Sequence, residues 1–448
     1  MRKVNASEVV AASRFNKFHL AVFLWCVYAI AFDGFDIAMY GVGLPVMMTD
    51  FGLTSVEAGS IGSYVLVGMM AGAFICGPLA DTIGRKKVLA ICMFLFSVFT
   101  FLSGLAPNAA VFTIMRVMAG IGMGGLMPTV IALMSEYSPK KNRALIVATM
   151  YCGYSVGGIL AALIGMSIMQ DFGWRVLYWI GIIPLFTLPF FLKKFPESLS
   201  YYMLRGRGDK LADILNRIDP DGNYKENDDY EFAIAKENAK GFPVKKLFVD
   251  HRALSTFAFC LAVFSCLIMI YGLNTWLPKI MQESGYALSS SLSFSLVLGV
   301  GQIGGSLLGG YFVDRIGHRK VLVSMYVLSA CCFIALSFTS NLLLLYVLIA
   351  IGGACTVGTQ NLSNPYIYEF YPKEVRATGV GFTVGIGRIG AIAAPMVIGF
   401  LLTTSLAPQG AFIAFAVPSL LGAIAFVLVR EKYGRFDQLD MLEDQKVG

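Results

Sequence analysis

The sequence predicts an all-α membrane protein with twelve transmembrane helices in two pseudo-symmetric six-helix bundles. Three observations support this fold class: an apolar composition, apolar runs of membrane-spanning length, and motifs repeated between the two halves. Of 448 residues, 57% are hydrophobic and only 14% are charged, whereas soluble domains hold about 25% charged residues. The mean hydropathy of +0.70 also leaves little polar surface for water.

Each apolar run has the roughly 20 residues needed to cross a hydrocarbon core about 30 Å thick. Because lipid offers no hydrogen-bond partners to the backbone, we expect each run to be a helix. The first run is longer than the apolar region of a cleavable signal peptide, so we expect it to stay in the membrane. The predicted spans are residues 18–43, 57–80, 87–105, 109–135, 143–168, 174–192, 253–278, 290–313, 320–338, 342–368, 377–403 and 410–430.

A long polar segment at residues 193–252 separates six spans from six spans. It predicts an N-terminal bundle at 1–192, a linker at 193–252, a C-terminal bundle at 253–430 and a tail at 431–448. Within the linker we expect a helix near residues 209–217, and a mobile loop at 219–229 where turn-forming residues gather.

The loops that share a side with the N-terminus hold nearly all the Lys and Arg residues outside the spans, and the opposite loops hold only Arg175 and Lys279. Positive loops stay in the cytoplasm, so we expect a multi-pass protein of the bacterial inner membrane with both termini cytoplasmic. The net charge of +7 reflects this sidedness, and we expect no nucleic-acid partner.

Two motifs recur at an offset of 233 residues, which indicates a duplicated six-helix unit. Residues 77–89 (GPLADTIGRKKVL) match 310–322 (GYFVDRIGHRKVL), and 136–144 (EYSPKKNRA) match 369–377 (EFYPKEVRA). Both motifs place carboxylates and guanidinium groups at predicted cytoplasmic helix ends, where ion pairs could act as a latch or only fix loop geometry. The candidate latch residues are Asp81, Arg85, Glu136, Arg143, Asp314, Arg319, Glu369 and Arg376.

Four charged residues fall well inside predicted spans rather than at their ends, and a charge costs at least about 2.5 kcal/mol near a helix centre. Asp33 and Asp36 share one face of the first helix, which suits groups that load and release a proton; the alternative is a pair of ionised groups at a wet outer mouth. Arg388 and Arg116 break the repeat, because Ser155 and Ile349 stand at their offsets. We expect Arg388 to bind a carboxylate, of a substrate or of a first-helix aspartate, and Arg116 to couple protonation to helix packing.

Polar and aromatic side chains within the spans are candidates for a substrate pocket, although most aromatic residues are expected to serve packing and intramembrane amides can also join helices. They are Tyr40, Tyr151, Tyr154, Tyr271, Asn274, Gln302, Gln360, Asn361 and Asn364.

The repeated loop GxxxDxxGRK, together with the fourth-span run of residues 116–125 (RVMAGIGMGG) and the Pro-Glu-Ser of 196–198, resembles the signature motifs of the major facilitator superfamily. Residues 33–36 (DGFD), followed by Tyr40, and the surroundings of Arg388 are similar to the aromatic acid:proton symporters of that superfamily. Two departures, His318 in an arginine position and Ser200-Tyr201 after the Pro-Glu-Ser element, concern the latch more than the substrate site.

This resemblance implies a proton-coupled importer of a monocyclic aromatic carboxylate, such as benzoate or hydroxybenzoate, that works as a monomer by alternating access. The alternatives are import of another organic acid such as nicotinate, a sugar-type porter, a drug exporter, and a transporter-derived receptor. An embedded enzyme is disfavoured because the three histidines are scattered, and nine cysteines without a CxxC pair indicate no metal site. We expect the partners to be substrate, protons and the lipid bilayer, with no cofactor.

Overall fold

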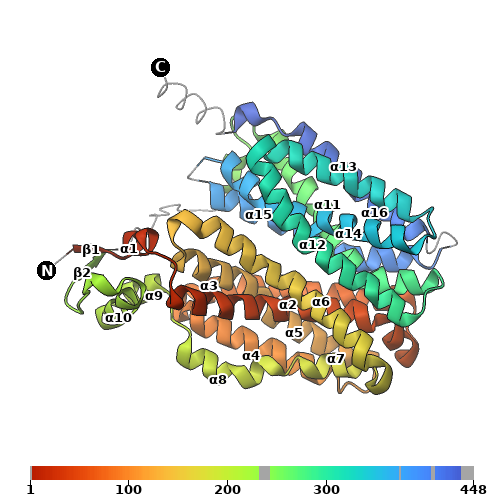
Figure 1. The fold of residues 1–448 in the computed structure, drawn as a ribbon, viewed down its shortest axis with the longest axis horizontal. Coiled ribbons are helices and arrows are strands. Elements are labelled where there is room, and N and C mark those ends of the chain that lie inside the picture. The colour runs from red at the N-terminus through yellow and green to blue at the C-terminus, as the bar shows by residue number, and fades with distance from the viewer. Residues whose placement is uncertain (1–2, 232–242, 373–374, 405–408, 435–448) are drawn as a thin grey trace. The chain divides into compact units, whose positions relative to one another are not determined.

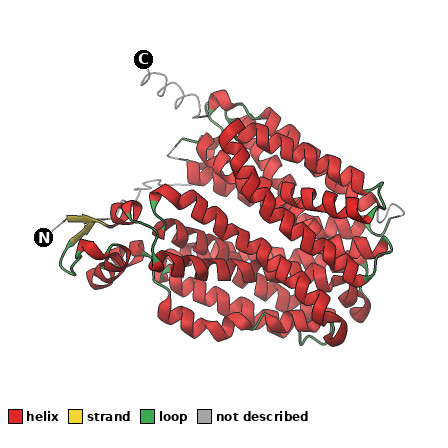
Figure 2. Cartoon of the chain, viewed as in Figure 1, coloured by secondary structure: helices red, strands yellow, loops and turns green. Residues whose placement is uncertain are grey.

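The computed structural model describes residues 3–231, 243–372, 375–404 and 409–434. Figure 2 shows these residues almost entirely as helix, with a single small sheet near the N-terminal end of the chain. Twelve segments among the described residues are long and apolar enough to cross a membrane, as the apolar runs predict.

The described chain divides into two compact units, and the division does not fall only at the linker. Residues up to Met39 pack with those from Tyr64 into the linker, whereas Tyr40–Ser63 pack with the second half. For example, the Ser63 hydroxyl donates to the Ile392 carbonyl oxygen at 2.6 Å. The contacts of Tyr40–Ser63 are therefore with the second unit.

Six spans of the described chain make up the bundle of the first half: five are single long helices, and the sixth consists of two consecutive shorter helices. Shorter elements precede and follow them. The elements of the first half and linker are β1 (Lys3–Asn5), α1 (Ala6–Ala12), α2 (Lys17–Phe51), α3 (Ser55–Ile83), α4 (Arg85–Ser103), α5 (Ala109–Tyr137), η1 (Lys140–Asn142), α6 (Arg143–Phe172), α7 (Arg175–Ile180), α8 (Ile183–Lys194), α9 (Leu199–Leu204), α10 (Gly208–Ile218), η2 (Pro220–Gly222) and β2 (Asp229–Glu231).

The second half is built from six long helices. Its described elements are η3 (Pro243–Leu247), α11 (Ala253–Glu283), α12 (Leu288–Ile316), α13 (His318–Leu336), α14 (Leu342–Phe370), α15 (Arg376–Leu401), α16 (Gln409–Leu428) and η4 (Glu431–Tyr433). Within this unit α12 packs on α14, and α11 packs on α15 and α16.

Two spans differ from their predicted form. The first helix continues through Pro45 to Phe51, well past residue 43, because the residues after Gly43 are apolar and the chain stays buried there. The sixth span is two helices, α7 and α8, interrupted around Gly181. The Gly181 carbonyl oxygen, which cannot continue the helix ladder, accepts a hydrogen bond from the Ser97 hydroxyl of α4 at 2.5 Å.

The described part of the linker contains short regular elements and pairs with the start of the chain. The expected linker helix is α10, and beyond it the Asn216 amide bonds the backbone of Tyr224 in both directions at 2.8 Å. The strand β2 then runs parallel to β1, a sheet that the sequence did not predict. Figure 1 shows β1, β2, α1 and α10 gathered at one end of the first unit.

The duplication is visible in local geometry as well as in sequence. Gly84 and Gly317 occupy equivalent turns with φ of +103° and +85°, a conformation that favours glycine. Asn108 and Asn341, also 233 residues apart, cap α5 and α14 through hydrogen bonds from Val111 and Leu344. The two halves therefore share their turn and cap chemistry.

Candidate functional site

A buried ion pair joins three helices of the first unit. Asp36 of α2 accepts hydrogen bonds from Arg116 of α5 at 2.9 and 2.7 Å, one on each carboxylate oxygen. Thr100 of α4 donates to the same carboxylate at 2.7 Å. Asp36 and Arg116 are each 1% exposed, and the Arg116 guanidinium also lies 5.5 Å from the ring centre of Tyr178. Two charges this deeply buried require each other, because an unpaired one would be strongly destabilising.

Asp33 lies about one helical turn before Asp36 and is also 1% exposed. The glycine between them lets helix α6 approach: a Cβ on Gly34 would lie 2.0 Å from the Tyr154 carbonyl oxygen. Gly157 makes the reciprocal approach, since its Cβ would lie 1.9 Å from the Ala31 carbonyl oxygen. The backbone of α6 therefore presses directly on the helix segment that carries both aspartates.

Arg388 lies in the second unit, on α15. Its guanidinium donates to the Tyr271 hydroxyl of α11 at 3.4 Å, and the side chain is only partly buried. Flanking glycines bring α11 close, because a Cβ on Gly390 would lie 2.5 Å from the Phe264 carbonyl oxygen. The two candidate residues Arg388 and Tyr271 thus lie side by side.

The remaining candidate pocket residues make the following contacts within the protein. The Tyr40 hydroxyl donates to the Ala58 carbonyl oxygen at 2.5 Å, and the Asn274 amide donates to the Ile270 carbonyl oxygen at 2.8 Å. The Asn361 amide donates to the Ser306 hydroxyl at 2.9 Å, and the Gln360 amide donates to the Asn364 side-chain oxygen at 3.4 Å. The Asn361 bond joins α14 to α12, which fits a role in helix packing. Tyr154 faces the close α2–α6 contact through its backbone.

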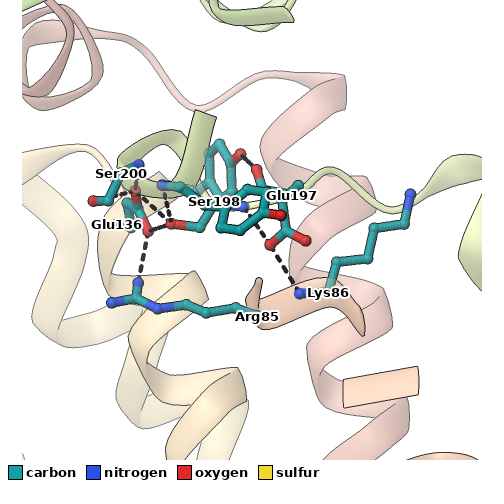
Figure 3. Close-up of polar contacts among 8 residues, drawn as sticks. Arg85, Lys86, Glu136, Glu197, Ser198 and Ser200 are labelled. Carbon is teal, nitrogen blue, oxygen red and sulfur yellow. Dashed lines mark hydrogen bonds and ion pairs between the residues drawn. The ribbon is translucent and has the colours of Figure 1, made fainter. Parts of the chain in front are cut away.

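Glu136 is the centre of the polar cluster in the first unit, drawn in Figure 3. Arg85 donates to it at 2.7 Å, the Ser198 hydroxyl at 2.8 Å, and the Ser200 amide and hydroxyl at 2.7 and 2.9 Å. Its side chain is 5% exposed. Arg85 and Glu136, two of the candidate latch residues, form an ion pair, and the linker residues Ser198 and Ser200 bind the same carboxylate.

A second carboxylate, Glu197, caps the helix that Arg85 begins. It accepts hydrogen bonds from the backbone amides of Lys86 and Ser198 at 2.9 Å, and its backbone carbonyl accepts the Tyr137 hydroxyl. A negative charge at a helix N-terminus is favourable. Burial raises the pKa of the nearby Tyr202 phenol, and the charge of Glu197 raises it further.

The second unit repeats this arrangement with weaker contacts. His318 Nδ1 stands 3.9 Å from Glu369 Oε2, where the first unit has Arg85 and Glu136. Arg319 does not pair with a repeat carboxylate; it lies 3.6 Å from Glu431, which also accepts the Tyr366 hydroxyl at 2.8 Å. We refer to the clusters around Glu136 and around Glu369 as the first and second latch clusters.

Arg143 and Arg376, two further candidate latch residues, bind backbone carbonyl oxygens and have no ion pair with a described carboxylate. Each guanidinium instead folds back onto the carbonyl oxygen five residues earlier: Arg143 donates to Ser138 at 3.3 Å and Arg376 to Tyr371 at 2.9 Å. These two residues therefore fix equivalent loops. The other two candidate latch residues are Asp81, whose side chain lies outside the described part, and Asp314, which is exposed at the end of α12.

Among the described residues, no group of three His, Cys, Asp or Glu side chains could hold a metal ion. Two stretches of the chain, residues 25–309 and 295–438, match the Major Facilitator Superfamily. The chain belongs to the major facilitator superfamily. Its family and relatives are transporters rather than enzymes, and the predicted twelve-helix fold is confirmed.

The relatives narrow the family to its aromatic acid branch, as the helix-one motif predicts. The chain is 39% identical to the benzoate transport protein of Acinetobacter baylyi, over 96% of this chain and 94% of that protein. It is 34% identical to the gentisate transporter of Corynebacterium glutamicum (92% and 88% covered) and 29% to the 4-hydroxybenzoate transporter of Pseudomonas putida (95% and 96%). The inward-open xylose transporter XylE from E. coli has the same fold, with a TM-score of 0.73 at 17% identity (92% and 95% covered).

Sequence reasoning missed the pairing of Arg116 with Asp36 and the contribution of Thr100. It selected both charged residues as costly intramembrane charges, but it assigned them separate roles. A charge inside a membrane span needs an oppositely charged partner. This requirement could have predicted the pairing. Thr100 carried no comparable signal, because a threonine within a span satisfies itself on its own helix.

Proposed function

We propose that this transporter imports a monocyclic aromatic carboxylate of the benzoate or hydroxybenzoate type together with protons. The observation that carries the substrate assignment is Arg388, a partly buried arginine within a membrane span, whose guanidinium lies beside the Tyr271 hydroxyl. A guanidinium binds a carboxylate through two parallel hydrogen bonds, and a phenol ring offers an apolar face with a polar tip to an aromatic acid. The names of the relatives support the same class of substrate.

Asp33 and Asp36 are the proposed proton-coupling groups, with Arg116 transmitting the effect. Protonation of Asp36 would remove the charge that holds Arg116 and would thereby alter the contact of α2 with α5. Asp33, one turn away on the same helix, would exchange a proton with that pair. A proton on α2 would then change helix packing as well as charge, which is what coupling requires.

The proposed setting is the bacterial inner membrane, with both termini cytoplasmic and a monomer as the working unit. Transport proceeds by alternating access between two pseudo-symmetric halves, as is usual for transporters built from internal repeats. The bundles at 1–192 and 253–430 would be the moving halves, and the two latch clusters would stabilise their proposed cytoplasmic helix ends.

The test is uptake of labelled benzoate and 4-hydroxybenzoate into cells expressing the chain, at acidic and neutral external pH, with and without a protonophore. We expect accumulation that is greater at acidic pH and abolished by the protonophore. Arg388→Ala should abolish it, whereas Arg388→Lys, which keeps the charge without the two-pronged geometry, should raise KM. Uptake of nicotinate or xylose in place of both acids would overturn the substrate assignment, and protonophore-resistant accumulation would overturn proton coupling.

A further inference from the structure

One side chain, Asn16, joins the start of α2 to the end of the linker helix α10. Its Oδ1 accepts hydrogen bonds from the backbone amides of Phe18 and His19 at 2.9 and 3.2 Å. Its Nδ2 donates to the carbonyl oxygens of Arg217 and Ile218, both at 3.0 Å. The same amide therefore satisfies free N–H groups at the beginning of one helix and free C=O groups at the end of another.

Few side chains could serve both helix ends. An N-cap needs only an acceptor, which Ser, Thr, Asp or Asn can supply. Binding two carbonyl oxygens at the same time requires two N–H donors on that side chain, and among these four residues only asparagine has them. The arrangement also brings the positive end of α2 to the negative end of α10, which is electrostatically favourable.

Further contacts hold the linker against the same end of the first unit. Lys3 of β1 pairs with Asp229 of β2 in the parallel sheet and forms an ion pair with Glu231 at 3.2 Å. The Arg217 guanidinium lies 4.9 Å from the ring centre of Phe18. The linker residues through β2 belong to the first unit.

Phe18 connects this junction to the first latch cluster. Its ring packs edge-on against Tyr137, with ring centres 5.5 Å apart, and the Tyr137 hydroxyl donates to the Glu197 carbonyl oxygen. The start of α2, the end of α10 and the first latch cluster therefore form one continuous set of contacts. Asp33 and Asp36 lie further along the same helix, α2.

The repeat shows that Asn16 is more than a helix cap. Asn108 and Asn341 are equivalent residues of the two halves, and each caps the helix that follows it. At the same offset from Asn16 the second half has Val249, and the helix α11 is preceded instead by Arg252. Among the described residues this junction occurs in the first half alone, so it serves something specific to that half, and the linker begins where the first half ends.

We propose that Asn16 is a positioning residue that fixes the linker to the start of α2, so that α10 and β2 move with the helix that carries Asp33 and Asp36, and that this attachment supports the rate of transport. The transport part of this inference rests on the proposed function. The attachment itself does not.

The decisive variant is Asn16→Asp, which keeps an acceptor for the amides of α2 but removes both donors to α10. Hydrogen exchange of the full-length protein in detergent should show the amides of 210–219 exchanging about tenfold faster, with the first turn of α2 unchanged. The matched control is Asn108→Asp, which should leave both regions as in the wild type. Asn16→Ser also keeps a cap without the two donors, and it provides the same test if the aspartate variant fails to fold.

Uptake by the same variants separates positioning from simple stabilisation. We expect Asn16→Asp to lower Vmax severalfold with KM unchanged, because the substrate residues are intact. Wild-type exchange of α10 in both Asn16 variants would overturn the attachment. Faster exchange of α10 together with a wild-type Vmax would overturn the link between the attachment and transport. A wild-type protein that transports none of the aromatic acids would overturn the proposed function, and the exchange result alone would then test the attachment.

Discussion

At the residue scale, the buried ion pair of Asp36 and Arg116 is where we expect a single substitution to lower the free energy of unfolding most. Both side chains are buried, so removing one partner leaves an uncompensated charge, which typically costs about 3–5 kcal/mol. We expect Asp36→Asn and Arg116→Gln each to lower the free energy of unfolding by about that amount. The measurement is thermal unfolding of the purified protein in detergent.

The double variant Asp36→Asn with Arg116→Gln distinguishes pairing from two independent effects. Because it leaves two neutral amides and no buried charge, its loss should be smaller than the sum of the single losses. Additive losses would show that the two groups do not stabilise each other. Uptake measured in parallel reports whether the pair also serves transport.

Gly34 supports a second prediction at this scale, because no larger residue fits between α2 and α6. A Cβ there would meet the Tyr154 carbonyl oxygen at 2.0 Å, and backbone cannot move aside easily. We expect Gly34→Ala to destabilise the protein by about 1–3 kcal/mol, as overpacking does. Gly77→Ala is the control, since a Cβ at Gly77 meets nothing within 4 Å, and equal melting temperatures for the two variants would contradict the prediction.

These residues show where sequence reasoning ends. Charges in apolar runs identify Asp33, Asp36, Arg116 and Arg388 without any structure, because the cost of burying a charge depends on local sequence alone. Which charge pairs with which depends on how the helices are rotated and packed. Periodicity does not determine this, so the pairing of Arg116 and the tyrosine beside Arg388 required coordinates.

At the element scale, the duplication provides an internal comparison between the two latch clusters. The Glu136 side chain is 5% exposed and accepts hydrogen bonds from four donor groups, whereas the Glu369 side chain is 50% exposed and stands 3.9 Å from His318. We expect Glu136→Gln to lower the free energy of unfolding by about 2 kcal/mol, the scale of hydrogen bonds to a charged group. Glu369→Gln should change it by less than about 0.5 kcal/mol.

Melting temperatures of the two glutamine variants test this comparison directly. A larger loss at Glu369 than at Glu136 would mean that exposure and distance do not rank the two clusters. His318→Arg gives the second cluster the residue found in the first unit. In that background the loss of unfolding free energy caused by Glu369→Gln should approach the loss caused by Glu136→Gln, which itself should not change.

Helices were predicted most reliably where the length of an apolar run decides that the run spans the membrane. Twelve apolar runs gave twelve helical spans, because any backbone in lipid must satisfy its own hydrogen bonds. The break at Gly181 was missed because its carbonyl is satisfied by Ser97, a residue more than eighty positions earlier. The pairing of β1 with β2 was also missed because the two strands are far apart in the sequence, with the whole first bundle between them. In addition, a strand of three residues is too short to show a recognisable pattern.

At the scale of the whole molecule, the asymmetry of positive charge predicts the topology. Loops rich in Lys and Arg remain cytoplasmic, so residues 87 and 141 should lie inside and residues 107 and 284 outside. Lys87, Lys141, Pro107 and Ser284 are all exposed, so a cysteine at each should be reachable from its own side. We expect a membrane-impermeant maleimide to label Pro107→Cys and Ser284→Cys in intact cells, above the signal of the unmodified chain. Lys87→Cys and Lys141→Cys should be labelled only after the cells are permeabilised. The reverse pattern would place both termini outside and would also reverse the proposed direction in which the latch clusters face.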